Sequence, residues 1–315
     1  MITGSAVPVD IDELKHSGTG RFSWLKMRPM TLFESGESSG TVRLADLFNG
    51  HPVTAETAKS FDLEHMANIV CRGGWPQSLM MTGRAWFETA KNILQAIAER
   101  DISRVDNTTR DPDRALKLMR SYARLQGTQA SAKVIKADLA SSEMISIGDD
   151  TIYSYLNALR KLFVIEESHA WCPNLRTKDA VRTSDTRYYV DPSIAVAALG
   201  AGPGELMDDL KTFGFLFETM AMRDLRVYAE ALEGEVRHYH DKQGLECDAV
   251  IHLANGRYAL FEIKLGGKRL IDEGANTLNA LSRLIADKNL PTPAFRMIVT
   301  AVGEFAYTRQ EDGII

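Results

Sequence analysis

The chain has 315 residues, of which 44% are hydrophobic and 25% are charged, so it can bury one large core or about two ordinary ones. Its net charge of −5 argues against a generally basic surface for nucleic acid, and contact with DNA would have to come from a local basic patch. The sequence has no apolar run of the roughly 18 residues that span a bilayer and no leader-like start, so we expect no membrane partner and a cytoplasmic location.

The first residues, Met1-Ile2-Thr3-Gly4-Ser5, have the pattern of a buried strand end followed by a turn. Chains rarely begin inside a core element, so a missing upstream portion is one explanation of this pattern. An ordinary ragged N-terminus explains the pattern equally well, and both explanations stay open at this stage.

Residues 44–192 are predicted to form a mainly helical region that ends in a winged helix. Apolar residues recur at spacings of three and four between Leu44 and Gln126, as expected for several amphipathic helices. The adjacent glycines before Trp75-Pro76 and the polar stretch 107–112 interrupt this pattern. A helix from about residue 131, a polar turn and a second helix capped by Asp149 or Asp150 then give a helix-turn-helix pattern.

A wing is predicted after this helix-turn-helix, with strands at 163–165 and 187–190 around a basic loop. Between residues 110 and 187 there are 13 Lys or Arg against 10 Asp or Glu, which is a small positive surplus. DNA is therefore an expected partner, and the candidate nucleic-acid contacts are Arg176, Lys178 and Arg182. Winged helices also mediate packing, so self-association or a protein partner bound through the helical half is the alternative.

Residues 200–315 change to an α/β pattern. The predicted order is helix, strand, strand, strand, helix, strand, at 205–229, 236–240, 248–253, 257–265, 271–285 and 296–301. This order is typical of a mixed sheet with helices packed on it. The predicted fold class is therefore α/β, or α+β over the whole chain, with a helical and winged-helix first half followed by a mixed-sheet domain.

The predicted strand at 257–265 carries an acid and an amine on one face, because Glu262 and Lys264 alternate with apolar residues. A strand that is apolar on both sides is usually interior, where such charges need a partner or a ligand; a surface ion pair is the alternative. Asp248 lies on the preceding strand, and Asn255-Gly256 is a strong hairpin signal. A two-residue loop would turn Asp248 away from Glu262, whereas a three-residue loop with a bulge at Gly256 would place the two acids opposite each other. We predict the three-residue loop.

These residues predict a site for a hard divalent cation. Neighbouring carboxylates repel each other unless a cation neutralises them, and oxygen ligands suit Mg²⁺ or Mn²⁺ rather than zinc. Such an ion polarises a phosphoryl oxygen, while Lys264 is suited to orient water or to stabilise charge on phosphate. The candidate catalytic residues are Asp248, Glu262 and Lys264, and the candidate metal ligands are Asp248, Glu262 and Glu218. Glu218 comes from the preceding helix, where a surface glutamate beside Arg223 is the alternative interpretation.

The arrangement of Glu218, Asp248 and Glu262-x-Lys264 resembles the PD-(D/E)XK nuclease superfamily, which implies a restriction-endonuclease-like domain over residues 200–315. Nearly the whole chain is also similar to the C-terminal portion of prokaryotic AAA-plus ATPases that carry a DUF4143-like domain of unknown function. The similar stretches are Ile2-Thr3-Gly4-Ser5, Gly20-Arg21, Arg72-Gly73-Gly74-Trp75-Pro76, Thr151-Ile152-Tyr153-Ser154-Tyr155-Leu156, Tyr188-Tyr189-Val190-Asp191, Gly214-Phe215-Leu216-Phe217-Glu218 and Gly244-Leu245-Glu246-Cys247-Asp248.

In that family an ATPase core precedes the similar portion, so the resemblance implies that residues 1–43 are a remnant of the AAA-plus module. The sequence has no GxxxxGK[ST] loop, and we expect no ATP hydrolysis by this chain alone. Two positions depart from the family pattern, since His240 stands where relatives often have arginine and Cys247 where they have valine. The lost arginine weakens the expected contact with phosphate, whereas a small apolar cysteine should be tolerated.

Two functions agree with these residues. The first is a Mg²⁺- or Mn²⁺-dependent phosphodiesterase that acts on DNA, motivated by the acids and the lysine of the candidate site. The alternative is a non-catalytic DNA-binding, regulatory or interaction module, favoured by the net negative charge and the missing arginine.

Overall fold

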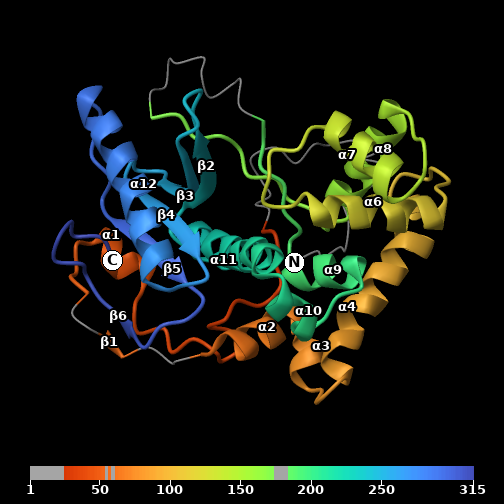
Figure 1. Ribbon diagram of the computed structural model, residues 1–315, viewed down its shortest axis with the longest axis horizontal. Helices are drawn as coiled ribbons and strands as arrows, with labels where there is room; N and C mark the ends of the chain where they lie inside the picture. The colour runs from red at the N-terminus through yellow and green to blue at the C-terminus, as the bar shows by residue number, and fades with distance from the viewer. Residues whose placement is uncertain (1–24, 54–55, 58–60, 174–183) are drawn as a thin grey trace, which may run out of the picture.

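The computed structural model describes residues 25–53, 56–57, 61–173 and 184–315. Within these ranges, the long helix α11, Leu210–Glu230, lies between a helical part, at the right of Figure 1, and a part built on a four-stranded sheet, at the left. This architecture confirms the predicted fold class, a helical first half followed by a mixed sheet. The expected strand end at the start of the chain lies outside the described residues.

The helices of the first half begin and end at local sequence signals. α2 begins after Asp62, whose carboxylate accepts from the His65 amide at 2.7 Å, and it ends at Gly73, which has a φ of 73°. α6 begins after Asp111 in the same way. The helices described before α11 are α1 Leu44–Phe48, α2 Leu63–Arg72, α3 Pro76–Leu79, α4 Ala85–Ala96, the π-helix η1 Ile97–Asp101, α5 Ile102–Arg104, α6 Pro112–Arg124, α7 Ala132–Ser142, α8 Asp149–Lys161, α9 Pro192–Leu199 and α10 Pro203–Asp208. In the described ranges, no helix combines the length and apolar character needed to cross a bilayer.

The predicted helix-turn-helix is present as α7 and α8, followed by two antiparallel chain segments. These segments meet at the bridges Ile165↔Tyr189 and Ser168↔Thr186 rather than forming two full strands. Phe163 has a left-handed φ of 56°, so the extended segment begins only after it. We call the two segments, residues 164–170 and 184–190, the hairpin arms.

The sequence made two further predictions for this region, one for the N-terminal cap of α8 and one for the basic loop. The expected capping of α8 by Asp149 or Asp150 is wrong, because the N-cap is Gly148 and the helix already begins at Asp149. The Asp149 carboxylate instead lies 2.7 Å from the Lys136 ammonium on α7. The loop residues predicted to contact nucleic acid lie outside the described residues; they are Arg176, Lys178 and Arg182.

The sheet has the strand order β2-β3-β4-β5, with β2 Gly234–His240, β3 Glu246–Leu253, β4 Tyr258–Lys264 and β5 Arg296–Thr300. The first three strands are antiparallel, and β5 runs parallel to β4 after the helix α12, Lys268–Asp287. A short pair joins β1, Glu56–Thr57, to β6, Phe305–Ala306. The single helix expected at 205–229 is divided into α10 and α11, because Asp209 caps α11 by accepting from the Thr212 amide at 3.1 Å.

Hydrophobic side chains cover both faces of the sheet. α11 contributes Phe213 and Met220 to a core that includes Phe261 of β4 and continues into the helical part. α12, which lies in front of the sheet in Figure 1, packs Leu278 against Leu260 on the other face. β4 is therefore buried until its last residue, as predicted for an interior strand.

A buried ionic cluster, which we call the junction cluster, joins the two parts and consists of Asp191, Arg223 and Asp224. The Arg223 guanidinium lies 2.8 Å from both carboxylates. Asp191 also accepts from the Gly74 amide at 2.9 Å, and Asp224 accepts from the Leu32 amide at 2.8 Å. An added Cβ on Gly74 would lie 2.2 Å from a backbone carbonyl oxygen, so the close approach of these segments requires glycine there.

Candidate functional site

The β3–β4 hairpin has the predicted register. Its ladder ends at the pair Ala249↔Phe261, and the next step of the same register places Asp248 opposite Glu262. The loop has three residues, because the amide of the residue before it still donates to the carbonyl oxygen of the residue after it, at 2.9 Å. Its last residue, Gly256, has a φ of 83°, as the predicted bulge requires. The alternative two-residue loop is therefore excluded.

Lys264 lies between the two acids at the end of this hairpin. Its Nζ is 3.0 Å from Asp248 Oδ2 and 2.6 Å from Glu262 Oε2. Asp248 Oδ2 also accepts from the Ile263 amide at 2.7 Å, which fixes the carboxylate where the backbone ladder stops. Glu262 is only 4% exposed, and the other two side chains are about one-fifth exposed, at 20% and 22%. The structure thus brings Asp248, Glu262 and Lys264 into direct contact.

Glu218 reaches the same region from α11. Its Oε1 accepts a hydrogen bond from the Tyr188 hydroxyl at 2.5 Å. Burial, and then the negative charge of Asp248, raises the pKa of the Glu218 carboxyl well above its ordinary value. Glu218 therefore lies within electrostatic range of Asp248. Arg223, its alternative partner from the sequence, is engaged in the junction cluster.

The side chains of Glu218, Asp248, Glu262 and Lys264, which we call the sheet cluster, carry more acid than base. Burial and then the Asp248 charge raise the pKa of Glu262 to about 8. Burial alone would lower the pKa of the Lys264 ammonium, but Asp248 and Glu262 outweigh it and raise that pKa above its ordinary value. A single ammonium therefore has to compensate acids that still repel one another.

The chemistry of the sheet cluster fits a hard cation, although the acids are not arranged as a preformed coordination sphere. Carboxylate oxygens are preferred ligands of Mg²⁺ and Mn²⁺, and the raised carboxyl pKa values indicate a local lack of positive charge. In the described part of the chain, no three His, Cys, Asp or Glu side chains are grouped closely enough to hold a metal ion. The Lys264 ammonium, which contacts Asp248 and Glu262, has the neutralising role there.

The two departures from the family pattern lie on β2 and β3, beside the site. His240 Nδ1 is 3.0 Å from Gln129 Oε1 and 3.2 Å from Glu246 Oε1. Cys247 is 1% exposed, its thiol contacts the Phe261 carbonyl oxygen at 3.3 Å, and burial raises the pKa of that thiol well above its ordinary value. Cys247 thus behaves as the small buried residue that we expected.

Tyr188 was not predicted from the sequence as a residue of the site, although it was placed on a strand and in a stretch similar to the AAA-plus family. Neighbouring residues of an extended segment point to opposite sides, so Tyr188 and Tyr189 cannot both face the helical core. Tyr189 donates to the Met119 carbonyl oxygen at 2.6 Å, whereas Tyr188 points the other way, to Glu218. This alternation was the available signal.

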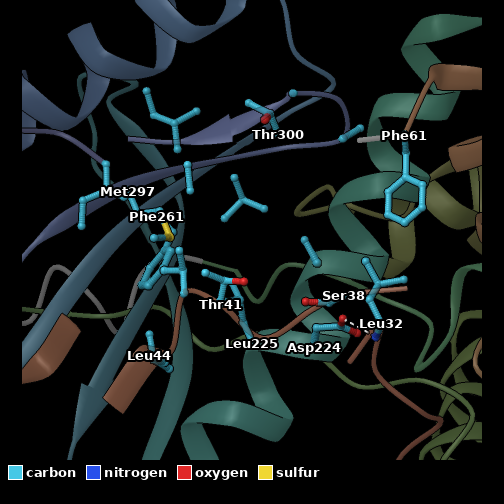
Figure 2. A pocket seen from close by; sticks show the side chains of 18 of the residues that line it. Leu32, Ser38, Thr41, Leu44, Phe61, Asp224, Leu225, Phe261, Met297 and Thr300 are labelled. Atoms are coloured by element: carbon cyan, nitrogen blue, oxygen red, sulfur yellow. Dashed lines mark hydrogen bonds between the residues drawn. The ribbon is translucent and has the colours of Figure 1, made fainter. Parts of the chain in front are cut away.

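A separate cavity of about 410 Å³ lies between α11, β5 and the segment before α2 (Figure 2). Its lining is mainly apolar and includes Leu225, Phe261 and Met297, which Figure 2 shows around the same space. The residues of the sheet cluster do not line it. The candidate site is therefore distinct from this cavity.

Comparison with protein families finds two matches. Residues 63–205 match a family described as domain of unknown function (DUF8612), and residues 213–313 match domain of unknown function (DUF4143). The C-terminal part of the chain thus carries a DUF4143 domain, as the resemblance implied. No curated protein and no solved structure matches the chain. The sheet cluster lies within the second match, and Tyr188 lies within the first.

Proposed function

We propose that the sheet-containing part of the chain is a metal-dependent phosphodiesterase of the PD-(D/E)XK type that acts on DNA. The observation that carries this proposal is the contact of the Lys264 ammonium with Asp248 and Glu262 from two adjacent strands. The flanking helix α11 contributes Glu218, and the mixed sheet with helices on both faces is compatible with a restriction-endonuclease-like fold.

The proposal includes a relationship to the C-terminal portion of AAA-plus ATPases. It is supported by the DUF4143 match over residues 213–313 and by the similar stretches in both halves of the sequence. The sequence contains no GxxxxGK[ST] loop, so we expect no ATP hydrolysis by this chain.

Asp248, Glu262 and Glu218 are the residues that would hold Mg²⁺ or Mn²⁺. When bound, such an ion supplies polarisation of a phosphoryl oxygen and a lowered pKa for a nearby water. The charge of the ion would take over the neutralising role that Lys264 now has between Asp248 and Glu262. The ammonium would then be free to act on the substrate.

Phosphodiester hydrolysis adds water across one phosphorus–oxygen bond. The water oxygen forms a new bond to phosphorus, the bond to the leaving ester oxygen breaks, and that oxygen receives a proton, which yields a phosphate monoester and an alcohol. The Lys264 ammonium would stabilise the negative charge that develops on the non-bridging phosphate oxygens. Asp248, fixed by the Ile263 amide, would keep its carboxylate in place through the reaction.

Cleavage of plasmid DNA by the full chain with Mg²⁺ or Mn²⁺ tests this function. We expect cleavage that disappears with chelator and falls by at least about 100-fold in Lys264→Ala, because loss of a group that stabilises transition-state charge has effects of this size. Asp287→Asn, which changes an exposed acid at the end of α12, is the matched control and should retain activity. Cleavage that persists in Lys264→Ala, or its absence from the wild type with either ion, contradicts the proposal.

A second candidate function, DNA binding without cleavage, is favoured by the exposed side of α8. Tyr153, Asn157 and Lys161 recur at spacings of four on the solvent side of this second helix of the helix-turn-helix. This candidate predicts salt-dependent binding to duplex DNA, with a log–log slope that becomes smaller in Lys161→Ala and in variants of Arg176, Lys178 and Arg182. Binding that does not respond to salt excludes it.

A further inference from the structure

We propose that Tyr188 is a positioning residue for Glu218, so that the helical half of the chain completes the metal site of the sheet-containing half. This inference rests on the proposed function, because it assigns Glu218 to metal binding. It goes further in assigning part of the site to the region that matches DUF8612, which contains Tyr188 but none of the predicted ligands.

The contact between Tyr188 and Glu218 is direct and partly buried. Tyr188 is 1% exposed, and its hydroxyl donates to Glu218 Oε1 at 2.5 Å. The Arg226 guanidinium lies over the Tyr188 ring, 5.4 Å from its centre, and the same guanidinium is 3.7 Å from Glu166 Oε2. The ring is therefore covered by a guanidinium that is itself paired with Glu166, and the hydroxyl is directed at the Glu218 carboxylate.

The backbone around Tyr188 is fixed from two sides by the helical half. On one side, the Glu166 amide donates to the Tyr188 carbonyl oxygen at 2.9 Å, within the hairpin arms. On the other side, the Gly127 amide donates to the Arg187 carbonyl oxygen at 2.7 Å, and the Arg187 amide donates to the Thr128 carbonyl oxygen at 3.0 Å. The hydroxyl position thus depends on the loop after α6 and on the hairpin arms.

The same loop packs directly on α11 beside Glu218. A Cβ added to Gly127 would lie 2.8 Å from the Phe215 ring and 3.6 Å from Glu218 Oε2. Gly127 also has a φ of 68°, so the loop can approach α11 this closely only with glycine at that position. Glu218 is therefore enclosed by the helical half on the side where Tyr188 contacts it.

A hydroxyl that donates to one oxygen of a ligating carboxylate restricts the rotation of that carboxylate. Groups that orient metal ligands in this way typically change metal affinity by about 10- to 100-fold when they are removed. We expect the hydroxyl of Tyr188 to contribute to Mn²⁺ affinity within this range, although it does not reach the metal itself.

The test compares Mn²⁺ binding by Tyr188→Phe and Tyr189→Phe in the full chain. Each variant loses one buried hydroxyl with one hydrogen bond, but only the Tyr188 hydroxyl contacts Glu218. Titration calorimetry at constant pH should give a dissociation constant about 10- to 100-fold higher for Tyr188→Phe and unchanged for Tyr189→Phe. Melting temperatures in chelator show whether either variant is merely unstable, which a structural role alone would produce without a change in affinity.

A double-variant cycle gives a second readout. In a Glu218→Gln background, Tyr188→Phe should produce no further loss of Mn²⁺ affinity, because its target carboxylate is gone. Equal affinity of Tyr188→Phe and wild type, or equal losses in Tyr188→Phe and Tyr189→Phe, overturns the positioning role while leaving the proposed function intact. Absence of Mn²⁺ binding by the wild type overturns the proposed function and this inference together.

Discussion

The sheet cluster and the junction cluster are both groups of acids around one cation, but they are built differently. In the junction cluster, the Arg223 guanidinium contacts two carboxylates, and a backbone amide also donates to each of them. Burial raises the pKa of Asp224 as well, but there the Arg223 charge is the largest influence against burial. In the sheet cluster, the Asp248 charge adds to burial, and the pKa of Glu262 rises to about 8 despite the Lys264 ammonium. A planar guanidinium with fixed donors suits a permanent structural contact, whereas under-neutralised acids can accept another cation. This difference distinguishes a cluster that joins two parts of the fold from one that can bind a ligand.

The largest effect on stability is expected at the junction cluster. Arg223→Met would leave Asp191 and Asp224 buried without their cation and should lower the unfolding free energy by about 3–5 kcal/mol. Lys264→Met should cost clearly less, because Glu262 can take up a proton near neutral pH and Lys264 is partly exposed. Urea unfolding of both variants at pH 7 measures the difference. A cost for Lys264→Met that equals or exceeds that of Arg223→Met would remove the distinction between the clusters.

The next largest effect is a pH dependence that originates in the sheet cluster. The pKa of Glu262 is raised from 4.5 to about 8, so protonated Glu262 stabilises the folded state. This contribution is complete below pH 4.5 and is lost as the pH rises through 8. In metal-free buffer, the unfolding free energy of wild type relative to Glu262→Gln should fall on the order of 3 kcal/mol between pH 5 and 8. Parallel stability curves for the two proteins would show that Glu262 ionises normally.

A smaller effect is expected on the pKa of Glu262, which should respond to an acid of the sheet cluster but not to an acid of the junction cluster. Asp248→Asn removes the charge that, after burial, raises the pKa of Glu262, so we expect this pKa to fall by about one unit. Asp191→Asn changes an acid of the junction cluster and is the matched control, with no expected effect on Glu262. Carbon-detected NMR of the Glu262 carboxyl during a pH titration measures both shifts. An identical pKa in Asp248→Asn and wild type would argue against the coupling of the two acids.

The smallest expected effect concerns two glycines with positive φ. Gly256→Ala places a side chain in the left-handed region at an open hairpin loop and should cost about 1 kcal/mol. Gly127→Ala should cost more and should also weaken Mn²⁺ binding, because its Cβ would press on Phe215 beside Glu218. Thermal unfolding and calorimetry of both variants check this order. An effect of Gly256→Ala on Mn²⁺ affinity would contradict the assignment of that loop to the fold alone.

The parts of the site that were predicted depend on local rules. Asn255-Gly256 fixes the loop, and the alternation of side chains then places Asp248, Glu262 and Lys264 together, so residues 248–264 alone are enough to predict this contact. The four strands of the sheet and α12 were also predicted, because their apolar periodicity agrees with their final burial, whereas the two-residue strands β1 and β6 were not.

The parts that were missed depend on packing between distant segments. The contact of Tyr188 with Glu218 joins residues 30 positions apart in different parts of the fold, and periodicity gives only the side on which each lies. The glycine pair before Trp75 was predicted to break a helix and belongs to a stretch similar to the AAA-plus family, but neither observation predicts that the Gly74 amide donates to Asp191 of the junction cluster. The division of the predicted helix at Asp209 was missed because its apolar pattern continues across the break.

Anomalous diffraction from crystals of the full chain soaked in Mn²⁺ tests the central claim most directly. The claim is that the under-neutralised acids of the sheet cluster hold a divalent ion. We predict one strong manganese peak within about 2.5 Å of carboxylate oxygens of Asp248 and Glu262, and no peak at the junction cluster. A sheet cluster without manganese, or manganese bound only elsewhere on the chain, would contradict the claim.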